Sequence, residues 1–165
     1  MVRRAMGEFP KPGAEHLRLH ALTGVWKTRT KEYASPGAAP RESMGEFLAR
    51  MDLGGYFLCR EVNYGMQGFQ GRGVTGYDPR RGIYVGTWMD STSPWIHRTE
   101  GHFDEAGNYC EHSEGVDHDG SVLRMRLETE RAGPDDMLFR MYCVAADGTE
   151  TLAVEIEQTR RRFVR

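Results

Sequence analysis

The sequence predicts an all-β domain, an antiparallel up-and-down barrel of about ten strands that begins with one short helix. Short runs of β-branched and aromatic residues recur along the chain, each followed by a turn sequence of hairpin length. Glycine accounts for 20 of 165 residues, whereas proline, at 7, is ordinary. A chain of this length buries roughly 68–70% of its unfolded surface, which is enough for one core without disulfides. These observations favour a compact, turn-rich barrel.

The helix is predicted within residues 12–22. Leu19 and Leu22 stand three positions apart, as on one helix face, and Thr23-Gly24 ends the segment. Residues 1–11 are then an N-terminal extension, and residues 12–165 form a single barrel domain.

The ten strands are predicted from the runs that lie between turn sequences. Glycines inside the runs, such as Gly45, Gly86 and Gly101, mark bends or close backbone approach, which a small barrel needs at its corners. The predicted strands cover 25–33, 41–52, 56–64, 69–78, 83–91, 95–104, 109–116, 121–130, 137–144 and 150–163.

One glycine pattern, Gly71-Arg-Gly-Val-Thr-Gly76, has the spacing of a dinucleotide fingerprint. That fingerprint must follow a strand and open a helix, whose N-terminus holds the pyrophosphate. Here the pattern runs into Tyr77-Asp-Pro-Arg-Arg-Gly, a turn between strands. We therefore predict no nucleotide cofactor.

The order of motifs resembles that of the calycin barrels (lipocalins, fatty-acid-binding proteins and nitrobindins), in which a short helix precedes a Gly-x-Trp. More closely, residues 9–163 resemble an uncharacterised bacterial domain-of-unknown-function family, number fifteen-seventy-nine. The motifs that carry the resemblance are Pro-Gly-x-Glu-His at 12–16, Gly24-Val-Trp26, Leu53-Gly-Gly-Tyr-Phe57, Gly73-Val-Thr-Gly-Tyr-Asp78, Thr87-Trp-Met-Asp-Ser91 and Gly101.

The resemblance implies a structural plug at one end of the barrel. In calycins the tryptophan of Gly-x-Trp is packed by a basic residue from the last strand, which here implies Trp26 and one of three consecutive arginines. Alternation with Leu152, Val154 and Ile156 selects Arg160 as the inward one.

Candidate ligand-binding residues follow from alternation in two neighbouring runs. Tyr84, Trp88 and Asp90 share one face, and Trp95 and His97 share a face of the next run. The period alone leaves open which face is inward. If these faces line the lumen, the site has aromatic walls and a few polar groups, as small-molecule pockets do.

Two further residues, Phe57 and Glu61, complete this candidate lumen from the third predicted strand. The leading hypothesis is a barrel that binds a small hydrophobic or aromatic molecule. An enzyme of the isomerase, cyclase or lyase type is an alternative, with Asp90, His97 and Glu61 as acid–base candidates. A packed lumen without a ligand is a third reading, in which Asp90 instead bonds the amides of the following turn.

The histidines predict no metal site. His16 and His20 share a helix face without a third ligand, while His97 and His102 point to opposite faces of one strand. A haem held by His97 alone, as in nitrobindin-like barrels, is kept as an alternative.

Charge and cysteine content limit the partners and the compartment that we expect for this protein. The net charge is −2, and the Arg-rich end at 160–165 is balanced by Glu155 and Glu157, so we expect no nucleic-acid partner. No apolar run of signal-peptide or membrane-span length occurs, and three widely spaced cysteines suit a reducing compartment. We expect a cytoplasmic protein, with a homodimer as an open alternative.

Overall fold

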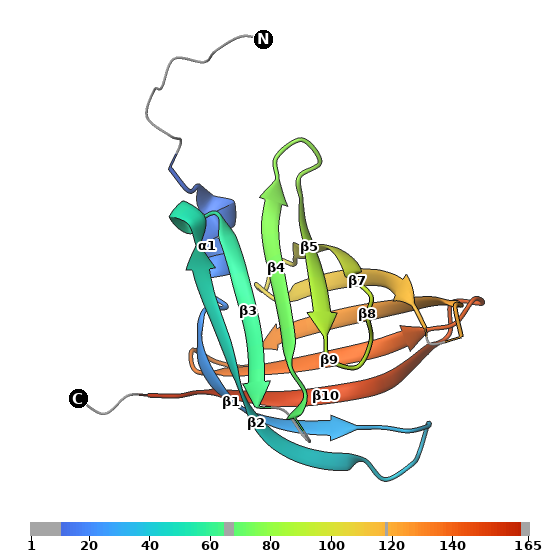
Figure 1. Cartoon of the computed structure of the whole chain (residues 1–165). Coiled ribbons are helices and arrows are strands. Elements are labelled where there is room, and N and C mark those ends of the chain that lie inside the picture. Colours follow the sequence, from blue (N-terminus) through green and yellow to red (C-terminus); the bar gives the residue numbers. More distant parts are fainter. Residues whose placement is uncertain (1–10, 65–67, 118, 163–165) are drawn as a thin grey trace.

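The computed structural model describes residues 11–64, 68–117 and 119–162 and forms a closed antiparallel barrel of ten strands (Figure 1). This confirms the predicted fold class. The elements in chain order are α1 (Ala14–His20), β1 (Gly24–Glu32), β2 (Arg41–Asp52), a 3-10 turn η1 (Leu53–Gly55), β3 (Phe57–Tyr64), β4 (Gly71–Asp78), β5 (Ile83–Asp90), β6 (His97–Phe103), β7 (Tyr109–Val116), β8 (Val122–Arg131), β9 (Asp136–Val144) and β10 (Glu150–Arg160).

Each strand pairs with its neighbour in the chain, and β1 pairs with β10 to close the sheet. Closure leaves no free edge that another chain could extend. At the closing seam Trp26 lies opposite Arg160 on one side and opposite Phe47 on the other. Cross-strand partners share a face, so these registers determine which side chains point into the barrel.

The predicted extent of β6 and β10 needs correction. The β6 strand begins at His97 and not at Trp95, because Ser93-Pro94 interrupts the strand conformation and proline has no N–H to donate to the ladder. The β10 strand ends at Arg160. Three features lie outside the described residues: the predicted strand end at Phe163, most of the N-terminal extension, and His118, which the sequence places at the surface beside an acidic turn.

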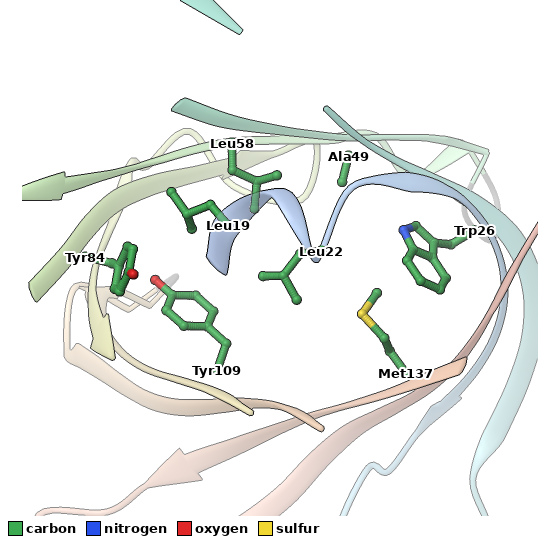
Figure 2. Packing of buried hydrophobic residues seen from close by; sticks show 8 residues of the cluster. All are labelled: Leu19, Leu22, Trp26, Ala49, Leu58, Tyr84, Tyr109 and Met137. Atoms are coloured by element: carbon green, nitrogen blue, oxygen red, sulfur yellow. The ribbon is translucent and has the colours of Figure 1, made fainter. Parts of the chain in front are cut away.

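The helix α1 covers one end of the barrel and contributes its apolar residues to the core (Figure 2). Leu19 and Leu22 pack among Leu58, Tyr84 and Tyr109, and Leu19 has no exposed surface. The Tyr84 hydroxyl donates a hydrogen bond to the Glu15 carbonyl at 3.0 Å, which ties α1 to β5. No helix among the described residues is long and apolar enough to cross a membrane.

The barrel interior differs between its two ends. Beneath α1 the inward side chains are almost completely buried, Trp26 and Tyr109 at 1% exposure each. Toward the opposite end the inward apolar side chains of β8, β9 and β10 are only half-buried, although the closed sheet surrounds them. Solvent therefore reaches this half of the interior. We call this surface the apolar wall; it consists of Leu123, Met125, Leu127, Phe139, Met141, Val154 and Ile156.

A β-bulge in β10 corrects one predicted orientation. The register shifts between Leu152 and Val154, so that Val154 lies opposite Met141 while Leu152 lies opposite Tyr142. The Tyr142 ring stacks on Arg126, 4.1 Å from the guanidinium carbon, on the outer face. A bulge adds one residue to one strand and thereby shifts the alternation. Leu152 therefore does not share the inward face of Val154 and Ile156.

Candidate functional site

A layer of polar side chains crosses the middle of the barrel interior. Inward positions of β3, β4, β6 and β7 contribute it, because their registers align along one face. We call it the polar layer, and it consists of Arg60, Thr75, Thr99, Glu111 and Ser113. The Arg60 guanidinium is its centre: Nη1 donates to Glu111 Oε2 at 3.2 Å, and Nη2 donates to Thr75 Oγ1 at 2.9 Å.

The ion pair between Arg60 and Glu111 is removed from solvent. The Glu111 side chain is 2% exposed and the Arg60 side chain 15%. Burial alone would lower the pKa of Arg60, but the Glu111 carboxylate and Tyr109 together raise it above its ordinary value. Burial raises the pKa of Tyr109 strongly, and the neighbouring Glu111 carboxylate raises it further. The ion pair of the layer therefore lies beside a phenol, that of Tyr109, which remains protonated.

Several polar atoms around this pair have no hydrogen-bond partner among the described residues. They are Arg60 Nε, Thr99 Oγ1, Ser113 Oγ and His97 Nδ1, and each is fully buried as an atom. Thr99, Ser113 and His97 are only 4%, 5% and 6% exposed. Buried polar groups in folded proteins almost always have a partner, and these four atoms have none that the described residues supply.

Glycines make room for these polar side chains inside the barrel. A Cβ on Gly86 would come within 2.8 Å of Thr99 Oγ1 and 2.9 Å of Thr75 Oγ1, so the two hydroxyls flank the same side-chain-free position. A Cβ on Gly115 would come within 2.7 Å of the His97 ring. The inward glycines thus admit the polar groups instead of filling the lumen.

Trp88 lies beyond the polar layer, toward the end of the barrel opposite α1, which we call the open end. Its indole occupies the space over Gly71 and Gly73, where a Cβ on Gly73 would come within 2.8 Å of the ring. The indole N–H donates to Asp90 at 3.0 Å, and the Thr92 amide donates to the same carboxylate at 2.9 Å. The second contact is the turn interaction that the sequence offered as the alternative role of Asp90. The fingerprint-like glycines therefore accommodate an aromatic ring.

The residues proposed from the sequence do not all reach the lumen. Trp88, Asp90 and His97 share the inward face of β5 and β6, opposite Gly71 and Gly115. Tyr84 is also inward but lies in the packed core beneath α1.

Three candidates lie elsewhere. Because Leu58 and Arg60 point inward, alternation directs Phe57 and Glu61 to the outer face. Phe57 packs over Gly76, and Glu61 pairs with Arg72 at 3.3 Å. Trp95 precedes β6 and is 43% exposed. The proposed acid–base set of Asp90, His97 and Glu61 therefore does not converge.

Sequence reasoning missed Arg60, Glu111, Thr99 and Ser113. Period-two alternation places Thr99 on the face of His97, and this was the available signal. Arg60 and Glu111 carried no such signal, because a charged residue within a strand is ordinarily read as solvent-facing.

The plug residues lie at the α1 end. The Arg160 guanidinium is 4.2 Å from the centre of the Trp26 ring, a cation–π distance. Arg160 also donates to the Thr23 carbonyl at 2.5 Å and pairs with Asp135 at 3.2 Å. These contacts join β1, β10 and the loop before β9 at the closing seam.

Metal and haem ligation were tested against the same geometry. Within 11–64, 68–117 and 119–162, no three His, Cys, Asp or Glu side chains come together as metal ligands would. The His16 Nδ1 accepts the Gly13 N–H at 2.9 Å, which is a cap of α1. The Nδ1 edge of the His97 ring is packed against Gly115 in the barrel wall, which leaves Nε2 as the ring atom that could hold a haem iron. Haem binding through His97 stays a prediction of the resemblance.

Two hollows lie on the outer surface and not in the lumen. One, of about 310 Å³, lies over β2 to β5 beside Leu48, Cys59 and Met89. The other, of about 590 Å³, lies where β10 ends, beside Asp135 and Arg162. Neither brings together a set of unpartnered polar groups like that of the polar layer.

Comparisons with known proteins agree with the fold. The structure of Rv2717c from M. tuberculosis superposes with a TM-score of 0.64 at 14% identity, covering 91% of this chain and 99% of that one. At this identity the likeness concerns the fold alone. The search of curated proteins found no match. The sequence model described as "Protein of unknown function (DUF1579)" matches residues 11–160, and the chain therefore belongs to the DUF1579 family.

Proposed function

We propose that this barrel binds a small molecule in its lumen, between the polar layer and the apolar wall. One observation carries the proposal: three buried polar atoms, of Arg60, Thr99 and Ser113, have no partner within the described part of the chain. Each unmet buried group costs about 1–3 kcal/mol, so a molecule that bonds to several of them gains correspondingly.

The half-buried apolar wall supports the same proposal. Small-molecule sites combine apolar walls with a few placed polar groups, and the lumen offers both on neighbouring strands, where Ser113 of β7 lies opposite Met125 of β8. Met141 and Ile156 lie on the side formed by β9 and β10, whereas Thr99 and Ser113 lie on that formed by β6 and β7. The proposed lumen therefore combines apolar walls with a few polar groups, as the sequence suggested, although the polar groups are largely different residues.

The proposal is tested with N-phenyl-1-naphthylamine, an uncharged dye that fluoresces when it leaves water. We expect saturable binding to the purified protein, and Met141→Trp, which fills the lumen from β9, should weaken binding at least 10-fold. Leu138→Trp is the matched control, because Leu138 lies on the outer face of the same strand, opposite Glu157.

Circular dichroism must show both variants folded. Absence of saturable binding, or equal binding by both variants, contradicts a lumenal site. If Met141→Trp does not fold, Met125→Trp on β8 replaces it, with Arg124→Trp as its outward control.

A further inference from the structure

We infer that the ligand is an uncharged amphipathic molecule, with one oxygen-bearing head group on the polar layer and an apolar body along the apolar wall. This rests on the proposed lumenal site and specifies its substrate class. Alcohols, ketones and amides belong to the class; carboxylates and phosphates do not.

The charges of the lumen exclude an anionic head group. Arg60 is the one lysine or arginine side chain that the registers place inside the barrel away from its ends, within the described residues. Its charge is already balanced by Glu111, 3.2 Å away. The inward His97 directs its Nδ1 edge at Gly115 in the wall. The next inward carboxylate, beyond Glu111, is that of Asp90 on β5. An anion in this space would meet two carboxylates and no unpaired lysine or arginine of the described strands.

A cationic head group is excluded by the donors it would meet. The unpartnered Arg60 Nε carries a hydrogen and only donates. A ligand ammonium also only donates, so it would leave Nε unmet and place a second positive charge beside the guanidinium. Nε therefore requires an acceptor oxygen.

The remaining unpartnered atoms fit a neutral oxygen. Thr99 Oγ1 and Ser113 Oγ each donate or accept, and they lie on paired positions of β6 and β7. A ligand hydroxyl accepts from Arg60 Nε and donates to one of these two, while a ligand carbonyl accepts from both kinds of donor. Either arrangement satisfies groups that the chain leaves unmet.

The apolar wall defines the other end of the molecule. Its seven side chains carry no hydrogen-bonding N or O atom, so a polar tail would lose its water without compensation. Burial of the tail contributes about 0.8 kcal/mol for each CH₂, which sets the affinity, while the polar layer sets the head group.

Calorimetric titration at pH 7.5 with four probes of one chain length tests the inference: 1-decanol, 2-decanone, decanoate and decyltrimethylammonium. We expect decanol and decanone to bind at least 10-fold more tightly than either ion. The double variant Thr99→Val/Ser113→Ala should weaken decanol binding about 10-fold. The outward variant Arg98→Gln is the control, because Arg98 lies on the opposite face of β6 from Thr99.

The outcomes separate the two proposals. If the dye binds in the lumen but decanoate or the ammonium binds as tightly as decanol, the substrate class is wrong and the lumenal site stands. If neither the dye nor any of the four probes binds, the lumenal site itself is wrong. If the double variant binds decanol as tightly as Arg98→Gln does, the head group does not contact the polar layer, and the inference is again overturned.

Discussion

The ion pair between Arg60 and Glu111 gives the sharpest test of the barrel interior. Glu111→Gln preserves the shape of the side chain but leaves the Arg60 charge without its carboxylate in a position where only 15% of the side chain is exposed. Breaking a buried pair by removing one partner costs about 3–5 kcal/mol, and the residual exposure of Arg60 favours the lower end. For a chain of this size, about 3 kcal/mol corresponds to a fall in Tm of about 6–12 °C.

The double variant Arg60→Met/Glu111→Leu distinguishes the cost of an unpaired buried charge from the cost of substituting these two positions. It removes both charges, and replacing a buried pair by apolar residues of similar volume is often neutral or stabilising. We therefore expect the double variant to be at least as stable as Glu111→Gln, despite carrying one more substitution. Unfolding in urea, followed by circular dichroism and by tryptophan fluorescence, gives the free energies; coincident curves justify two-state treatment.

A matched surface pair provides the control. Arg81 and Glu100 form two hydrogen bonds at 2.6 and 2.8 Å, better geometry than that of Arg60 and Glu111, but both side chains are about half exposed. Exposed pairs contribute little because water and salt screen them, so Glu100→Gln should leave the Tm nearly unchanged. If the Tm of Glu111→Gln falls no further than that of Glu100→Gln, the pair between Arg60 and Glu111 is not desolvated and the polar layer is not a buried one.

Three further predictions concern residues around the lumen. Gly71→Ala should destabilise the protein by about 1–3 kcal/mol and shift the fluorescence emission of Trp88, because the new Cβ would enter the indole. Gly76→Ala should leave that emission unchanged, because its Cβ would meet Phe57 on the outer face. Equal emission shifts would contradict the assignment of Gly71 to the inner face and Gly76 to the outer face. Gly115→Ala should displace the His97 ring, seen as a change in its NMR signals, and unchanged signals would show that the ring is not packed there. The raised pKa of Tyr109 keeps its hydroxyl protonated in the fold, so stability is lost as the pH rises above 10, the ordinary pKa of tyrosine. Urea unfolding from pH 8 to 11 should show a smaller loss for Tyr109→Phe than for the unmodified protein. An identical loss would show that Tyr109 is not its source.

The sequence predicted the strands well because their signals are local. Turn residues and period-two alternation are written in adjacent positions, and all ten strands appear where those signals placed them, with most ends shifted by one or two residues and the largest difference at the end of β10. The bulge at Leu152 was not predictable in this way, since the extra residue is visible only against the partner strand. Orientation along β10 therefore required the register.

The candidate site was predicted less well because its signals are non-local. Arg60 and Glu111 are 51 residues apart in the chain and meet only when β3 and β7 face one lumen. Each looks like an ordinary surface charge in sequence. Phe57 is the converse case: an aromatic residue in a strand suggests burial, yet the inward orientation of Leu58 directs Phe57 outward. In both cases the type of residue, charged or aromatic, suggested the wrong face of the strand.

The polar layer sets a limit on what the lumen can hold. Three unmet buried atoms at about 1–3 kcal/mol each would cost on the order of 3–9 kcal/mol, comparable to the whole stability of a typical domain. That cost favours any water or ligand that bonds to them. Water satisfies the donors but gains nothing from the apolar wall beside them. An amphipathic molecule satisfies the same donors and also buries that wall, and this is the physical reason for expecting it to displace the water.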